Sequence, residues 1–197
     1  TGLDDPAGLL AARLSEADLE TLRSARDRLI ESPLEADRAF ARSIGAVLPE
    51  DGLTIGVAEL STRVTAFGRY TPYASKVFAA GQAHRMIVYT EIDGFTYREA
   101  RAGDPVANGV ALSEQESVEL SQSVTLYQAD GYQAWHKPAE TVIETTRGRR
   151  RDFYLVQLIE LPRTLAAGQY NLKVTVKDKV SGAEAERVVG VELKAYQ

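Results

Sequence analysis

The sequence predicts a mainly β protein, in which an antiparallel β-sandwich over residues 53–197 follows a helical arm over residues 1–52. The first observation behind this prediction is a change of hydrophobic pattern near Asp51, from the period of amphipathic helices to the alternation of strands. The second is charge. Residues 1–52 hold eleven acidic side chains and six arginines, a net charge of −5, whereas the rest of the chain holds 17 charges of each sign. We therefore expect two domains that meet at this point.

Two helices are expected in the arm, with a third, shorter one over residues 6–14. The first of the two runs from Glu16 to about Glu31 and carries its leucines on one face. The second follows Ser32-Pro33, where a hydroxyl cap precedes a proline, and ends near Gly45. The arm has too few apolar residues for a core of its own, so we expect it to pack against the rest of the chain or against a partner.

Seven segments beyond Leu53 have strand patterns, and the turns between them predict an antiparallel sandwich of about seven to nine strands. Residues 86–89 are apolar on both faces, which predicts a central strand. Residues 131–138 are typical of a loop, with a glycine at one end and a proline at the other. The predicted strands lie within residues 57–67, 86–89, 118–126, 142–143, 153–159, 170–176 and 189–193.

Leu165, Gly168 and Tyr170 form an L-x-x-G-x-Y motif directly before the most regular of these strands. This spacing predicts a tyrosine corner, in which the phenol at the start of a late strand donates a hydrogen bond to upstream backbone. The alternative is a surface tyrosine beside an ordinary glycine turn. Either interpretation makes these three residues structural.

Four short segments of the sandwich resemble a pattern found in uncharacterised exported bacterial proteins. They are Phe78-Ala79-Ala80-Gly81, the Y-x-E-x-x-x-F run from Tyr89 to Phe95, Arg150-Arg151-Asp152-Phe153-Tyr154, and the segment from Leu161-Pro162 to Leu172. The resemblance covers roughly residues 53–193. It implies an immunoglobulin-like or fibronectin-III-like sandwich and an extracytoplasmic address, periplasmic or secreted, and it brings no known activity, cofactor or catalytic residue.

The composition argues against an enzyme. The chain has no cysteine, which excludes disulfides, thiolate metal sites and cysteine nucleophiles, and its only imidazoles are His84 and His136. It has no G-x-S-x-G, Walker, H-E-x-x-H or dinucleotide-binding motif. Glu91 and Asp93 share a strand face, but without a calcium-loop motif we expect solvated carboxylates. We therefore predict no cofactor and no metal, and a catalytic His136 would need an orienting acid and a pocket.

Two segments are candidates for binding. Tyr132, Trp135 and His136 form the one aromatic-rich loop, which suits a sugar ring or a protein hot spot; the alternative is that Trp135 fills the edge of the sandwich. The second segment is basic and suits phosphate, sulfate or carboxylate groups. It can instead be a solvated loop, or it can contact the acidic arm of the same molecule or of a neighbour. Its arginines are Arg147, Arg149, Arg150 and Arg151.

The leading functional hypothesis is a non-enzymatic extracytoplasmic interaction module that binds a protein partner or associates with itself. The alternative is a carbohydrate-binding module that uses Tyr132 and Trp135, and a hydrolase-like enzyme built on His136 ranks third. Nucleic acid is not an expected partner, because the isoelectric point is about 5.2 and the basic patch is small. No apolar run approaches the roughly 18 residues of a membrane span.

Overall fold

The structure is a computed structural model that describes residues 16–45, 52–105, 115–147 and 153–195. The chain divides into two compact units, Thr1–Asp51 and Gly52–Gln197, one residue away from the boundary expected from charge and periodicity. The predicted helix over residues 6–14, and the arginines at 149–151, lie outside the described residues.

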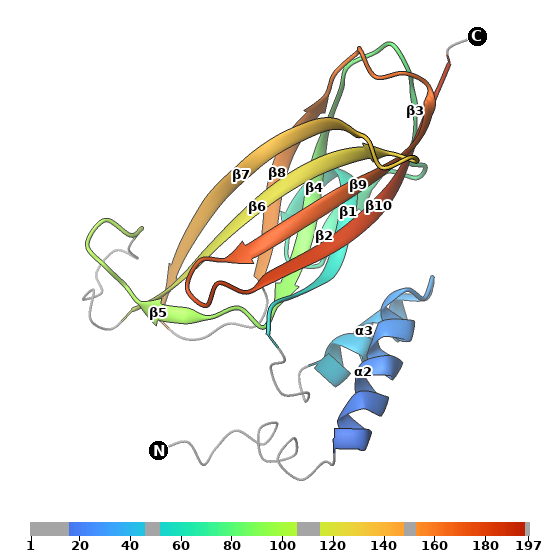
Figure 1. Cartoon of the computed structure of the whole chain (residues 1–197). Coiled ribbons are helices and arrows are strands. Elements are labelled where there is room, and N and C mark those ends of the chain that lie inside the picture. The colour runs from blue at the N-terminus through green and yellow to red at the C-terminus, as the bar shows by residue number, and fades with distance from the viewer. Residues whose placement is uncertain (1–15, 46–51, 106–114, 148–152, 196–197) are drawn as a thin grey trace, which may run out of the picture. The chain divides into compact units, whose positions relative to one another are not determined.

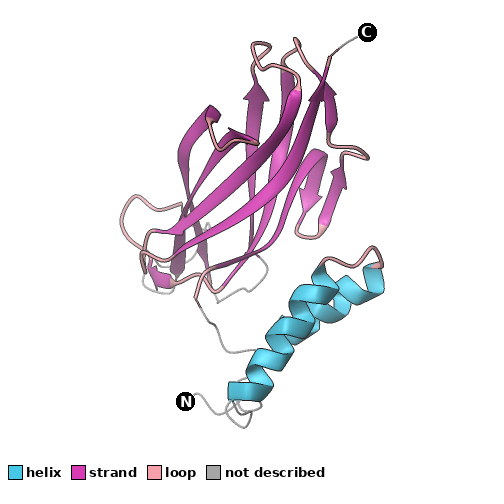
Figure 2. Cartoon of the chain, turned by 45° about the vertical axis from the view of Figure 1, so that its right-hand side comes forward, coloured by secondary structure: helices cyan, strands magenta, loops and turns pink. Residues whose placement is uncertain are grey.

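The first unit contains a helical hairpin, α2 (Glu16–Ile30) and α3 (Glu35–Gly45), shown in cyan in Figure 2. The backbone N–H of Leu34 donates to the hydroxyl of Ser32, and the Arg38 guanidinium donates to the Ser32 carbonyl, so the turn between the helices is capped by side chains. Ile44 packs against Leu22, Ala25 and Leu29. This small cluster is consistent with the expectation that the arm does not carry a full core.

The described part of the second unit contains ten strands, and three of them are short. Each of the seven predicted segments coincides with part of one of the seven long strands, and the three short strands bring the total to one more than the predicted seven to nine. The strands are β1 (Thr54–Ala66), β2 (Arg69–Pro72), β3 (Val77–Ala79), β4 (His84–Asp93), β5 (Tyr97–Glu99), β6 (Glu116–Gln128), β7 (Gln133–Thr146), β8 (Phe153–Leu161), β9 (Gly168–Asp178) and β10 (Glu184–Lys194).

These strands form two sheets that pack face to face (Figure 1). The four-stranded sheet has the order β2-β1-β4-β8, and the six-stranded sheet has the order β3-β10-β9-β6-β5, with β7 on the other edge of β6. The long strands can be given the letters used for immunoglobulin domains. In the four-stranded sheet, A, B and E are β1, β4 and β8, in the order A-B-E. In the six-stranded sheet, C′, C, F and G are β7, β6, β9 and β10, in the order C′-C-F-G. This is the connectivity of immunoglobulin-like sandwiches, and it confirms the predicted fold class.

The core lies between the sheets, and each long strand contributes alternate residues to it. On β9, for example, Leu172, Val174 and Val176 are fully buried, and Tyr170 begins the same row. The Tyr170 hydroxyl donates a hydrogen bond to the carbonyl oxygen of Ala166 at 2.8 Å, which is the bond expected of a tyrosine corner. Strand β4 lies between β1 and β8, as its two apolar faces predict.

The segment predicted as a loop over residues 131–138 is instead mostly strand, because β7 already begins at Gln133. Two features obscured it. Strand β7 is an edge strand, where polar side chains are tolerated, and it contains Pro138. Its pairing with β6 is also irregular between Gln122 and Val124, which breaks the alternation. Trp135 and His136 therefore lie on a strand and not in a loop.

Polar bonds join the two sheets at several points. Gln157 of β8 donates to the backbone carbonyl of Gln122 on β6 at 3.2 Å, with both side chains buried. The Arg187 guanidinium of β10 donates to the carbonyls of Ile55 and Gly56 at 3.1 Å each, where the pairing of β1 with β4 is irregular. Such bonds satisfy backbone groups that the sheet ladders leave unpaired.

Asp178 closes the end of the sandwich at the β9–β10 turn. Its fully buried carboxylate accepts hydrogen bonds from the backbone N–H groups of Thr96 and Val180, at 2.8 Å each, and from the Ser181 hydroxyl at 2.7 Å. Burial by itself would raise the pKa of Asp178, but these hydrogen bonds outweigh it and hold the pKa below the ordinary aspartate value.

We predict that Asp178→Asn lowers the free energy of unfolding by about 1.5–3 kcal/mol at neutral pH, because the amide cannot accept all of these bonds. A carboxyl whose pKa is lowered by folding stabilises the protein above its unfolded pKa, about 4, and loses this contribution as the pH falls through the folded value. Urea unfolding at pH 7 and pH 3 should show the difference between wild type and variant shrink at the lower pH. The exposed control Glu184→Gln should change stability by less than about 0.5 kcal/mol. A difference that stays constant with pH would contradict this role.

Candidate binding surface

The structure separates the aromatic residues that the sequence grouped together. Tyr132 lies in the β6–β7 turn and is 67% exposed. Trp135 is half-buried, lies opposite Leu126 in the ladder and packs against the core from the inner side of β7. The geometry thus fits the alternative in which Trp135 fills the edge of the sandwich. Arg147 is exposed.

His136 lies on the opposite side of β7 from Trp135, on the outer face of the six-stranded sheet. Its Nδ1 atom is 2.9 Å from the hydroxyl oxygen of Thr125. This partner is a hydroxyl, and not the orienting acid that we expected beside a catalytic His136. Within the described ranges, no group of three His, Asp or Glu residues is arranged to hold a metal ion.

The outer face of the six-stranded sheet brings His136 together with residues from three other strands. We call this surface the polar face. The ladder register places His136, Thr125, Lys173 and Val188 in one row across β7, β6, β9 and β10. The polar face consists of His136 and Thr141 of β7, Ser121, Ser123, Thr125 and Tyr127 of β6, Asn171, Lys173, Thr175 and Lys177 of β9, and Glu184, Glu186 and Val188 of β10.

The centre of the polar face is held by charge-assisted bonds. Lys173 Nζ is 2.7 Å from Glu186 Oε1, which also accepts a hydrogen bond from the Thr175 hydroxyl at 3.2 Å. The Glu186 partner raises the pKa of Lys173, and Lys173 lowers the pKa of Glu186. The ammonium also lies 5.7 Å from the ring centroid of Tyr127, within cation–π distance. These contacts hold the side chains of Lys173 and Glu186 in place at the middle of the polar face.

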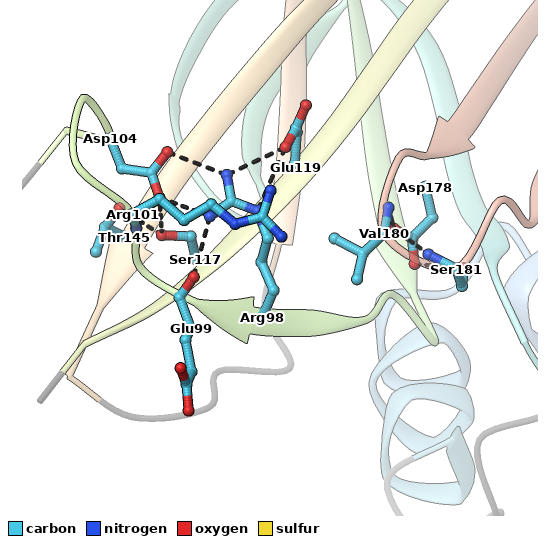
Figure 3. A network of polar contacts seen from close by, with 10 residues as sticks. All are labelled: Arg98, Glu99, Arg101, Asp104, Ser117, Glu119, Thr145, Asp178, Val180 and Ser181. Atoms are coloured by element: carbon cyan, nitrogen blue, oxygen red, sulfur yellow. Dashed lines mark hydrogen bonds and ion pairs between the residues drawn. The ribbon is translucent and has the colours of Figure 1, made fainter. Parts of the chain in front are cut away.

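An ionic network borders the same face at its β5 end (Figure 3). Arg98 donates to both carboxylate oxygens of Asp104, at 2.6 and 3.0 Å, and to Glu119 at 3.1 Å. Asp104 also accepts from the Ser117 hydroxyl at 2.9 Å, and Ser117 is in turn 2.9 Å from the Thr145 hydroxyl. The Arg98 bonds come first among the interactions that hold the pKa of Asp104 below its ordinary range.

This network fastens β5 and the following loop to β6. The side chains of Arg98 and Asp104 are both largely buried, and every charged group has a partner. We therefore assign the network a structural role, as a rigid border of the polar face. The sequence contained no indication of it, because Arg98, Asp104 and Glu119 are far apart and belong to no motif.

Comparison with known proteins adds little about function. No protein-family model matches this chain, and no curated protein matches it by sequence. Among solved structures, it is similar to the crystal structure of the C-terminal domain of Wzt, with a TM-score of 0.37 and 12% sequence identity over 74% of each chain. A similarity of this size carries no functional argument.

The different positions of Trp135 and Tyr132 predict different effects on stability. We expect Trp135→Ala to lower the free energy of unfolding by about 3 kcal/mol, because the ring packs against the core. Tyr132→Ala should change it by less than about 0.5 kcal/mol, because that side chain is mostly in solvent. Chemical denaturation followed by circular dichroism checks both. Equal effects of the two variants would mean that Trp135 does not pack as described.

Proposed function

We propose that this protein is a non-enzymatic binding module that works outside the cytoplasm, and that the polar face is its binding surface. The observation that carries the proposal is the set of exposed or half-buried polar side chains around the row of His136 and Lys173, which come from four adjacent strands of one sheet. Thr125, between His136 and Lys173 in this row, is itself buried. The extracytoplasmic address is supported by the resemblance to exported proteins. Of the described helices, none is long and apolar enough to cross a membrane.

The proposal of a non-enzymatic role is supported by the contacts of the chemically versatile side chains. His136 is bonded to a hydroxyl, and the strongly perturbed pair of Arg98 and Asp104 is buried in a structural network. Perturbed ionisable groups often mark active sites, but they also occur in structural ion pairs. Here Arg98 and Asp104 bind each other and are largely buried, which favours the structural explanation.

A carbohydrate is the ligand class that the polar face favours. The centres of protein–protein interfaces are rich in aromatic residues and arginine and poor in serine, lysine and glutamate. The polar face has the opposite composition, with charged groups along β9 and β10 and the partly exposed hydroxyls of Ser123 and Tyr127 on β6, while Ser121 and Thr125 are buried. Densely spaced donors and acceptors suit a polyhydroxylated ligand, and Tyr127 and exposed Tyr132 at the same end offer rings against which a sugar can pack. Carbohydrate binding at the polar face does not require Trp135, which packs against the core.

Site-specific photo-cross-linking tests whether the polar face binds anything. We expect Val188→p-benzoylphenylalanine, on the polar face, to give a discrete cross-linked product in cells that produce the protein. The same replacement at Thr71, which is exposed on β2 in the other sheet, is the matched control and should give none. Products from both positions, or from neither, would contradict the proposed surface.

A glycan array tests the carbohydrate candidate separately. We predict that the wild type binds at least one glycan class, and that His136→Ala combined with Lys173→Ala weakens this binding at least about tenfold, the equivalent of 1.4 kcal/mol. The control Arg63→Ala, an exposed position on β1, should bind as the wild type does. If the wild type binds no glycan across a broad array, carbohydrate is rejected as the ligand class, while the cross-linking result still decides whether the face is used.

A further inference from the structure

The outer face of the other, four-stranded sheet contains a carboxylate that is largely out of water. Glu91 of β4 is only 6% exposed, although it points away from the core between the sheets. Its Oε1 atom accepts a hydrogen bond from the Tyr89 hydroxyl at 2.7 Å. The ion pairs formed by the described residues include none with Glu91.

Aromatic rings cluster around Tyr89, whose hydroxyl donates to this carboxylate. The tip of the β1–β2 hairpin lies over β4, where the N–H of Gly68 donates to the Tyr89 hydroxyl at 2.7 Å and Tyr70 stacks on Tyr89 with 4.3 Å between ring centroids. Tyr154 of β8 is the ladder partner of Glu91. Its centroid lies 5.7 Å from that of Tyr89 and 6.4 Å from that of Phe67. We call Phe67, Tyr70, Tyr89 and Tyr154 the aromatic cluster.

The cluster keeps the hydroxyl of Tyr89 in its protonated, donating form. Burial raises the pKa of Tyr89, and the hydrogen bond to Glu91 raises it further. The Tyr89 phenol donates one hydrogen bond to Glu91 but carries no opposite charge. A carboxylate held away from water is stabilised by an opposite charge, and the ion pairs among the described residues supply none to Glu91, so a cation bound at this point would be stabilised.

The geometry points to a binding site for an organic cation, an ammonium or guanidinium group, formed by Glu91 with the rings of Tyr154 and Phe67. The face of an aromatic ring attracts cations through its quadrupole, and a carboxylate on the neighbouring strand adds the opposite charge. Tyr154 is the ladder partner of Glu91, and the Phe67 ring lies 6.4 Å from the Tyr154 ring. Tyr154 and Phe67 are only partly buried, so part of each ring is open to a ligand. This site is on the other sheet from the polar face and does not depend on it.

The surface beside the site favours a cation carried on an apolar stem. Val156 and Leu158 follow Tyr154 on the same face of β8 and are 48% and 42% exposed. An alkylammonium or alkylguanidinium can place its charge at Glu91 and its carbon chain on these two residues. The side chains of lysine and arginine have this form, as do small alkylamines, so both a peptide and a free amine meet the chemical requirement.

Nuclear magnetic resonance titrations with guanidinium, N-butylguanidinium and a short Leu-Arg-Leu peptide test the proposal, with potassium chloride at equal ionic strength as the blank. We expect saturable shifts of the Tyr154 and Phe67 ring protons and of the Gly68 amide, with dissociation constants of roughly millimolar order. Butylguanidinium should bind more tightly than guanidinium. Tighter binding of the peptide than of butylguanidinium would identify a polypeptide as the source of the cation, and the reverse order would identify a small alkylguanidinium.

Glu91→Gln keeps an acceptor for the Tyr89 hydroxyl but removes the charge, and we expect it to weaken binding at least about fivefold. Glu160→Gln, an exposed carboxylate on the same side of β8, is the matched control and should leave binding unchanged. If Glu91→Gln does not fold, Tyr154→Leu supplies the second variant and should weaken binding likewise. The proposal is overturned if the wild type shows no saturable shifts at these rings, or if the folded variants bind the cations as tightly as the wild type.

Discussion

The structure depends on the burial of one side-chain parity of each long strand between two sheets. On β6, Leu120, Val124 and Leu126 face the core, so the serines and threonines between them must face outward. Strands β7, β9 and β10 pair with this register and add their own outward residues to the same rows. A slip of one residue would exchange the two faces. The polar face is therefore a consequence of how the core is packed.

The same constraint explains where the sandwich ends. Gln122 of β6 is buried, but its ladder partner Glu140 on β7 is exposed, so at this ladder position the core stops between the two strands, whereas further along β7 Trp135 still packs against it. Lys137 of β7 donates to the backbone carbonyl of Leu158 on β8 at 2.9 Å and pairs with Glu140 at 2.7 Å, which lowers the pKa of that carboxyl. A lysine at this position covers the sheet edges, a common protection against pairing with another chain. We therefore place ligand binding on sheet faces and not on these edges.

Much of the fold could be predicted from the sequence, because regular alternation in β6, β9 and β10 reports directly on burial. Strand β7 could not, since Pro138 and an irregular ladder mask its period. The candidate sites were harder. Trp135 and His136 are adjacent in sequence, and only their place on a strand shows that they face opposite sides. Glu91, Tyr154 and Phe67 come from three segments, and no local pattern indicates that a hairpin tip covers Tyr89.

Hydroxyl-radical footprinting tests most directly whether the polar face is the binding surface, because it can be carried out before the ligand is identified. The oxidation of side chains would be compared between the purified protein and the protein in its native surroundings. We predict that Tyr127, Tyr132 and His136 become protected in the native surroundings. Tyr73 and Phe78, whose rings pack on each other outside the polar face, should be oxidised equally in both. Equal oxidation of all five residues, or protection confined to Tyr73 and Phe78, would contradict this prediction.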